Sequence, residues 1–304
     1  MLEVSLLGCG GMMPLPGRHL TSMCVRHNGS MLLVDAGEGT QVTLKQVGWG
    51  FKSIDTICFT HYHADHISGL PGLLLTIGNS NREAPLHLIG PKGLRHVVQS
   101  LLVIAPELPF ALKYTELDAK IPNRLVLETG IVLSTHPMTH HVPCLGFCLE
   151  LPRIGKFDQE RARALGLPVQ YWGRLQRGES FVQDGHTYTP CMVLGPPRKG
   201  LKLCYCTDSR PPKGIVDFVR GADLFICEGL YGDEAKFHKA IEHRHMMFQE
   251  AADIAKKAGV RELWLTHFSP ALVAPQAFLK NATDIFPNTL VGRDRLGTTL
   301  VFEE

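Results

Sequence analysis

The stretch Phe59-Thr60-His61-Tyr62-His63-Ala64-Asp65-His66 places three histidines and one aspartate within six residues. It continues the apolar run at residues 57–59, which predicts a buried strand that ends where the histidines begin. A single histidine is more often a core or surface residue than a ligand. Four imidazole and carboxylate groups at this spacing, however, are typical of sites for zinc, manganese or iron. The stretch therefore predicts that His61 and His63 hold one ion, and that Asp65 and His66 hold a second.

Short apolar runs elsewhere in the chain also predict buried strands, at residues 4–7, 31–34, 56–59, 86–89, 131–134, 201–206, 224–227 and 263–265. Helical periodicity is found at residues 94–104 and 247–258. Four strand-like runs are followed by residues that bind metals, namely Asp35, His140 or His141, Asp208 and His267. Because sites in α/β sheets gather beyond the carboxyl ends of strands, we expect these residues to complete the metal site. The spacing does not choose between His140 and His141, and Asp35 either closes a turn or orients a ligand histidine.

The composition is that of a globular protein with a large core. The chain has 304 residues, of which 44% are hydrophobic and 20% are charged, and this excludes a disordered or fibrous protein. The formal net charge of +2 permits a polyanionic partner without requiring one. The sequence does not open with a signal peptide, and it has no apolar run of about 18 residues, so we expect a cytoplasmic protein that does not enter a membrane.

Nine cysteines are present, and most lie inside apolar runs. An odd number of cysteines in such surroundings is typical of buried, reduced thiols in a cytosolic protein. We therefore expect no disulfide framework.

Residues 151–200 differ from the rest of the chain. They are rich in proline and glycine and contain eight basic and four acidic residues, a local excess larger than that of the whole chain. This composition favours an inserted basic arm that meets nucleic acid, with a solvated loop as the alternative.

Four stretches resemble the metallo-β-lactamase superfamily, and more closely its ribonuclease Z family of endonucleases, which mature the 3′ end of precursor transfer RNA (tRNA). They are VDAGEGTQ (34–41), FTHYHADHISGLPGLL (59–74), HHVPCLGF (140–147) and CTDSRP (206–211). The arm is also similar to that family, in FDQERARALGLP (157–168), LQRGE (175–179) and VLGPPRKG (193–200), whereas the wider superfamily lacks it. The resemblance spans nearly the whole chain.

This resemblance implies an α/β fold in which residues 1–304 form a single domain, a four-layer αββα sandwich, with residues 151–200 as an extruded tRNA-binding arm. It implies a homodimer in which the arm grips the body of the tRNA while the acceptor end enters the partner's site. Two zinc ions per subunit are implied, and the same ligands accept manganese or iron. The implied activity is removal of the 3′ trailer of precursor tRNA, leaving a 3′ hydroxyl.

The resemblance also assigns the ligands of the two ions: His61, His63 and His140 for the first, Asp65, His66 and His267 for the second, and Asp208 as the bridge. His140 is preferred to His141 because the family's ligand stands six residues before a glycine, here Gly146. Basic residues implied to bind the substrate are Arg18, Arg153, Lys156, Arg174, Arg177, Arg198 and Lys199.

Three residues match the family's catalytic groups. Two cations roughly 3.5–4 Å apart lower the pKa of a shared water toward ~7, and Asp65 is expected to accept its proton. His245, oriented by Glu228, is expected to protonate the departing ribose 3′ oxygen. The alternative for His245 is a solvated residue at the start of a helix.

Some family motifs are altered in this chain. Cys227-Glu228-Gly229-Leu230 keeps only the glutamate of the family's His-Glu-Ala-Thr, and Met246-Met247 stands where Ser-Thr usually follows the acid histidine. Residues 14–19 lack the lysine and asparagine of the Pro-x-Lys-x-Arg-Asn loop, which helps to reject mature CCA ends. We expect the metal chemistry to survive these changes.

Two other functions remain open from the sequence. One is a small-substrate hydrolase of the same fold, such as a phosphodiesterase or thioester hydrolase, which needs the ions but no arm. The other is a non-catalytic RNA-binding protein with a structural metal.

Overall fold

The structure is a computed structural model that describes residues 1–303. It divides into two compact units, one formed by Met1–Glu150 with Lys202–Val301, and the other by Leu151–Leu201 with the residues from Phe302 onward. None of the helices in the described part of the chain is long and apolar enough to cross a membrane.

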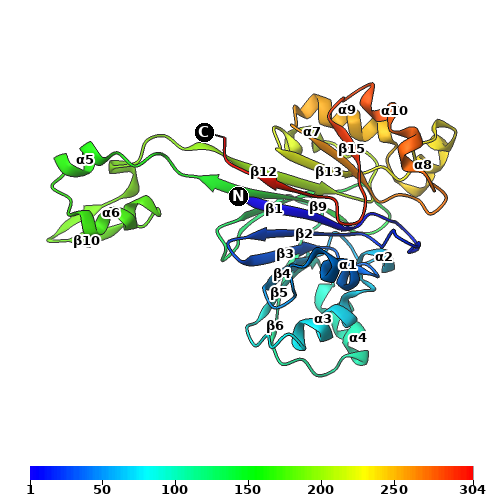
Figure 1. Ribbon diagram of the computed structural model, residues 1–304, viewed down its shortest axis with the longest axis horizontal. Helices are drawn as coiled ribbons and strands as arrows, with labels where there is room; N and C mark the ends of the chain where they lie inside the picture. The colour runs from blue at the N-terminus through cyan, green and yellow to red at the C-terminus, as the bar shows by residue number, and fades with distance from the viewer. Residues whose placement is uncertain (304) are drawn as a thin grey trace. The chain divides into compact units, whose positions relative to one another are not determined.

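The first sheet of the larger unit has seven strands (Figure 1). Their spatial order is β16 (Gly297–Leu300), β1 (Leu2–Gly8), β2 (Ser22–His27), β3 (Ser30–Val34), β4 (Ile54–Cys58), β5 (Leu86–Pro91) and β6 (Leu112–Leu117). The pairs from β16 to β3 are antiparallel and those from β3 to β6 are parallel, so the sheet is mixed.

The second sheet also has seven strands. Their order is β15 (Thr289–Val291), β14 (Leu263–Thr266), β13 (Leu224–Glu228), β12 (Arg198–Cys206), β9 (Leu145–Arg153), β8 (Val132–Pro137) and β7 (Asn123–Val126). Strands β12 to β15 are parallel, and β7 to β9 are antiparallel. The parallel strands β12, β13 and β14 therefore end at the same edge, which is where Asp208, Glu228 and His267 stand.

Helices cover the outer face of each sheet (Figure 1). Leucines and isoleucines of α1 (Thr40–Val47), α3 (Leu70–Gly78) and α4 (Leu94–Leu101) pack into one core with the first sheet. The second sheet packs against α7 (Ile215–Val219), α9 (Phe248–Ala258) and α10 (Lys280–Thr283). Two sheets between two helical layers form an αββα sandwich, so the predicted fold class is confirmed.

Shorter elements complete the larger unit. They are α2 (Ala64–Ile67), α8 (Phe237–His243) and the 3-10 helices η1 (Leu102–Ile104), η3 (Glu234–Lys236) and η4 (Pro275–Phe278).

The smaller unit has secondary structure and a core of its own. It contains α5 (Gln159–Ala164), α6 (Val169–Gln176), the hairpin β10 (Phe181–Gln183) with β11 (His186–Tyr188), and η2 (Pro190–Met192). Its buried side chains form one small cluster, Ala162, Leu167, Leu175, Phe181 and Val193. These residues are thus packed rather than solvated along their whole length.

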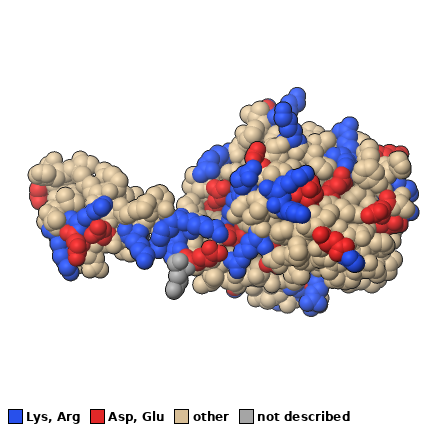
Figure 2. All heavy atoms as spheres, turned by 90° about the horizontal axis from the view of Figure 1, so that it is seen from above, with Lys and Arg blue, Asp and Glu red and all other residues tan. Residues whose placement is uncertain are grey.

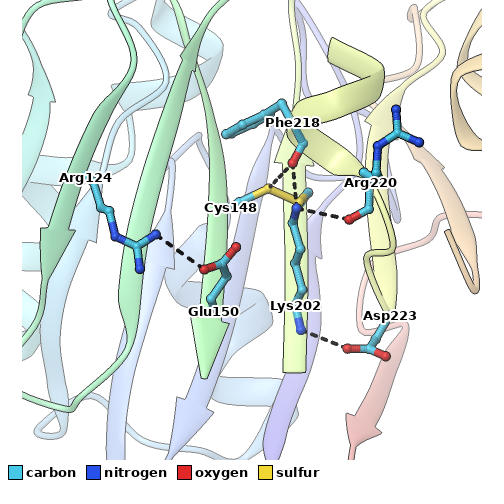
Figure 3. Close-up of a disulfide and its surroundings, with 8 residues drawn as sticks. Arg124, Cys148, Glu150, Lys202, Phe218, Arg220 and Asp223 are labelled. Carbon is cyan, nitrogen blue, oxygen red and sulfur yellow. Dashed lines mark hydrogen bonds and ion pairs between the residues drawn. A yellow bond between two sulfur atoms is a disulfide. The ribbon is translucent and has the colours of Figure 1, made fainter. Parts of the chain in front are cut away.

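The expectation of reduced cysteines was wrong for one pair. Cys148 on β9 and Cys204 on β12 are joined by a disulfide (Figure 3). The two strands are neighbours in the second sheet, and this places the two Cα atoms 4.1 Å apart although 56 residues separate them in sequence. The pairing of the strands therefore decides which cysteine Cys148 is joined to, and the number of cysteines does not reveal that pairing. The other seven cysteines are free, and all of these except Cys191 are buried.

Candidate metal centre

Strand ends deliver the predicted ligands to one place. His61 and His63 follow β4, and His63 is the residue from which α2 begins, so that α2 presents Asp65 and His66 in its single turn. Asp208 follows β12, and His267 follows β14. The carboxyl ends of β4 in the first sheet and of β12 and β14 in the second bring these groups together although they lie up to 206 residues apart in sequence.

The seven side chains form two groups of potential ligand atoms. The first contains His61, His63, His140 and Asp208, and the second contains Asp65, His66 and His267. Within each group the atoms lie within 4.8 Å of one another. His141, the alternative to His140, lines the adjoining cavity but belongs to neither group.

Asp208 faces both groups. Its Oδ1 atom lies 3.2 Å from Nε2 of His66 and 3.1 Å from Nε2 of His267. Its Oδ2 atom lies 3.6 Å from Nε2 of His61. One carboxylate thus presents an oxygen to each group, which is the geometry that a bridging ligand needs.

The distances between the imidazole nitrogens suit a cation held between the rings better than direct contact of the rings with one another. Nε2 of His61 lies 3.0 Å from Nδ1 of His63, and Nε2 of His66 lies 3.3 Å from Nε2 of His267. Neutral imidazoles present lone pairs at such distances unless a proton or a cation stands between them. Such a convergence of nitrogen and carboxylate donors is typical of a transition-metal site.

The backbone at three strand ends is left-handed although none of the residues is glycine. The φ angles are 63° at Asp35, 49° at Asp208 and 58° at His267. This region is sterically costly for residues with a β-carbon and is common at functional sites.

Asp35 belongs to neither group of potential ligands, but it contacts His66 of the second group. Its Oδ2 atom lies 2.8 Å from Nδ1 of His66, and its Oδ1 accepts the Thr60 N–H over 2.8 Å. Because Nδ1 of His66 is held in this way, Nε2 of that ring is left to face Asp208. This contact is what the reading of Asp35 as a residue that orients a ligand histidine requires.

Burial and charge set the protonation of the ligands. Burial lowers the pKa of His140 to about 4 and holds the pKa of His61 well below its usual range, so both imidazoles are neutral at pH 7. Neutral imidazole is the form that binds metals. At His66, burial opposes the charge, but the Asp208 and Asp35 carboxylates outweigh it and raise the pKa. A positive charge is therefore favoured at this point of the centre.

Glu228 and His245 lie beside the two groups of potential ligands. Glu228 is the fully buried last residue of β13, and its Oε2 atom lies 3.0 Å from Nδ1 of His245. Burial alone would lower the pKa of His245, but the charge and hydrogen bond of Glu228 raise it to about 9. The His245 ring lies 5.5 Å from the ring of His140 and 5.6 Å from that of His267, measured between centroids. His245 is buried and lies between α8 and α9, so it is not a solvated residue at a helix start.

A cavity of about 560 Å³ opens over the centre. Its lining includes His63, Asp65, His140, Asp208, His245 and His267. Five of the seven predicted ligands and His245 therefore line one space that is large enough to admit part of a substrate.

Two contacts at the site were missed in the sequence. The backbone N–H of Met12, a residue with a φ of 66°, donates to Oδ2 of Asp65 over 2.7 Å. Arg210 forms an ion pair with Glu250 and donates from Nη1 to the His245 carbonyl over 2.6 Å. Arg210 belongs to CTDSRP, one of the four stretches that resemble the family, so the sequence did point to it. A backbone donor such as the Met12 N–H has no sequence signature.

The predicted substrate-binding residues lie in both units. Arg18, in the larger unit, donates to the Leu272 carbonyl over 2.8 Å. In the smaller unit Arg174 and Arg177 share the single carboxylate of Glu179, at 3.2 and 3.1 Å. Arg153, Lys156, Arg198 and Lys199 also belong to the smaller unit, and Figure 2 shows the lysines and arginines on the surface.

Comparisons with known proteins agree with this geometry. A model of the metallo-β-lactamase superfamily matches residues 16–153. Proteins named ribonuclease Z from Lachnospira eligens and Lachnoclostridium phytofermentans are 55% and 52% identical, and each alignment covers 100% of this chain and 99% of the relative.

Solved structures share the fold. The human short-form tRNase Z is 25% identical, with a TM-score of 0.69 and coverage of 99% of this chain and 100% of the human one. The metallo-β-lactamase-fold protein YhfI from Bacillus subtilis is 20% identical, with a TM-score of 0.70 and coverage of 98% and 100%, a likeness of fold alone. Identity above 50% over the full length of the curated relatives shows that the chain belongs to the ribonuclease Z family.

Proposed function

We propose that this chain is a zinc-dependent endoribonuclease that removes the 3′ trailer of precursor tRNA and leaves a 3′ hydroxyl. The observation that supports it most is the position of Asp208 between two groups of potential ligands, with His245 beside both. The name of the relatives supports the choice of RNA over a small substrate.

One ion would be held by His61, His63 and His140, and the other by Asp65, His66 and His267. Asp208 would contact both ions. Zinc suits imidazole and carboxylate donors, and manganese or iron fits the same set. Two such ions, when bound, supply positive charge that neutralises phosphate oxygens and lowers the pKa of a water molecule toward ~7.

Asp65 is the proposed proton acceptor for the attacking water. Burial would raise its pKa, but the hydrogen bond from His267 and the charge of His66 hold the pKa of this carboxyl well below its usual range. Asp65 is therefore ionised at neutral pH. The Met12 N–H at 2.7 Å fixes one of its oxygens.

His245 is the proposed proton donor for the ribose 3′ oxygen, which is a poor leaving group unless it is protonated. Because its pKa is raised to about 9, the imidazole is charged at pH 7. Glu228 holds Nδ1, so Nε2 is the nitrogen left to deliver the proton.

Residues 151–200 are the proposed exosite for the body of the tRNA, through Arg153, Lys156, Arg174, Arg177, Arg198 and Lys199. Arg18 would contact the substrate near the site of cleavage. We further propose that the protein acts as a homodimer in the cytoplasm, with the arm of one subunit serving the centre of its partner.

The test is cleavage of a precursor tRNA with a 3′ trailer, with and without chelator, and with the cut mapped to one nucleotide. A single cut at the 3′ end of the tRNA body that is lost with chelator and restored by zinc is expected. Turnover of bis-p-nitrophenyl phosphate without any cleavage of the precursor would instead indicate a small-substrate hydrolase. RNA binding with no hydrolysis of either substrate would indicate a non-catalytic protein.

A further inference from the structure

Arg244 has a backbone conformation that its side chain does not favour. It follows the last residue of α8 and directly precedes His245, with a φ of 58° and a ψ of 48°. The His245 N–H donates to the Ala240 carbonyl over 2.8 Å, and the Arg244 N–H donates to that of Ile241 over 3.2 Å. These two bonds form a Schellman helix end, whose left-handed residue is usually glycine because a β-carbon is disfavoured there. An arginine at this position therefore needs another explanation.

The side chain of Arg244 supplies one. Its Nη1 atom donates to the backbone carbonyl of His140 over 2.5 Å, across 104 residues of sequence. Within residues 1–303, no carboxylate forms an ion pair with this guanidinium. The contact thus joins the segment of the proposed acid, His245, to the segment of a proposed metal ligand, His140.

His140 and His267 are the two proposed ligand histidines whose buried Nδ1 atoms have no hydrogen-bond partner within residues 1–303. By contrast, Nδ1 of His66 is held by Asp35, and Nδ1 of His61 lies 3.1 Å from the Thr60 hydroxyl. A ligand ring is usually fixed through its second nitrogen. For His140 that constraint is missing, so the position of its main chain governs where Nε2 points.

The backbone around His140 is held from two sides. The Thr139 N–H donates to the Ser209 hydroxyl over 2.8 Å, and the Arg210 N–H donates to the Thr139 carbonyl over 3.1 Å. These two bonds link the backbone around His140 to the segment that contains Asp208. Arg244 provides the link on the other side, to the segment of His245.

We propose that Arg244 is a positioning residue that sets His140 and His245 relative to each other. Its left-handed backbone places the proton donor, and its guanidinium fixes the main chain of a metal ligand. The inference rests on the proposed function for the roles of His140 and His245. Removal of the guanidinium releases the main chain of His140 from the segment of His245, so metal affinity and turnover decline together.

An alternative role for this exposed arginine is direct contact with an RNA phosphate, and the two roles give different kinetics. A phosphate contact acts on KM, is sensitive to salt and is kept largely by lysine. A positioning contact acts on kcat, also for a small substrate that does not reach an RNA-binding surface.

The experiment compares Arg244→Gly, Arg244→Lys and Arg295→Gly in the full chain. Glycine relieves the left-handed strain, which guards against unfolding. Arg295 is the matched control, because it is exposed and also left-handed, with a φ of 69°. Three quantities are measured: the Tm, zinc affinity by competition with a chromophoric chelator, and kcat and KM for precursor tRNA and bis-p-nitrophenyl phosphate.

We expect Arg244→Gly to stay folded, to bind zinc more weakly and to lose between about ten- and a hundredfold in kcat on both substrates. Arg244→Lys, which keeps one donor, should recover part of the loss, and Arg295→Gly should behave as wild type. Wild-type zinc affinity and kcat in Arg244→Gly, or a change confined to KM for RNA, would overturn the proposal. If wild type cleaves no precursor while zinc affinity still depends on Arg244, the proposed function fails and the positioning role stands.

Discussion

His245 and Glu228 form a buried pair in which Nδ1 of the imidazole lies 3.0 Å from Oε2 of the carboxylate. The carboxylate is fully buried, and its other oxygen accepts the Ser209 N–H, so Glu228 connects His245 to the segment of Asp208. The pair thus ties the proposed proton donor to the proposed bridging ligand.

Replacement of His245 by alanine should slow cleavage without removing metal. General acid catalysis contributes about 10²–10⁴-fold, and a loss of this size in kcat is expected because the ribose oxygen departs unprotonated. Single-turnover cleavage of precursor tRNA and metal content by elemental analysis measure the two effects. His238→Ala, an exposed histidine of α8, is the control. A loss below tenfold would exclude His245 as the acid.

Glu228→Gln should shift the pH dependence of kcat. The negative charge of Glu228 raises the pKa of His245 to about 9, so removing it lowers that pKa. The protonated form of His245 then disappears at lower pH, and the alkaline limb of the profile should move down by about one to three pH units. The profile is measured under saturating substrate from pH 6 upward. An alkaline limb at the wild-type position would mean that another group sets it.

Asp208→Asn should disrupt both metal groups together. The amide keeps the size of the side chain but removes the charge that faces His66, His267 and His61 at 3.2, 3.1 and 3.6 Å. We expect the zinc content to fall from two ions per chain toward one or none, and cleavage to be lost. Elemental analysis after gel filtration measures this. Retention of two ions with wild-type affinity would contradict a bridging role.

Glutamine at Arg174, Arg177, Arg198 and Lys199 should weaken RNA binding and leave the chemistry intact. These residues belong to the smaller unit, and each lost phosphate contact lowers the slope of log affinity against log salt by about 0.7–0.9. KM for precursor tRNA should rise, while kcat for bis-p-nitrophenyl phosphate stays unchanged. The matched control is Lys257→Gln with Lys280→Gln, two lysines of the larger unit that pair with Asp253 and Asp284. Equal changes with both substrates would argue against an exosite.

The sequence predicted most of the central strands but missed two of them, β2 and β9, and several edge strands. Buried runs such as 31–34 and 224–227 correspond to β3 and β13, because strands covered on both faces are continuously apolar. The edge strands β6, β7 and β16 consist mostly of exposed and partly buried residues, and no apolar run marks them. The periodic segment 94–104 is split, since α4 ends at Leu101 and continues as the 3-10 helix η1.

Residue type and position at strand ends predicted which side chains converge at the site. His61 and Asp65 follow β4 of the first sheet, Asp208 and His267 follow β12 and β14 of the second sheet, and the four residues come together where these strands end. Contacts that depend on the direction of the backbone could not be predicted from the sequence. The Met12 N–H on Asp65, the Arg244 contact with the His140 carbonyl and the Cys148–Cys204 disulfide all need the register of distant segments.

Anomalous diffraction from crystals of the active, zinc-loaded protein tests the central claim most directly. The account predicts two peaks on either side of the Asp208 carboxylate, one within bonding distance of His61, His63 and His140, and the other of Asp65, His66 and His267. A single peak, or active protein without a transition metal at this cluster, would contradict it.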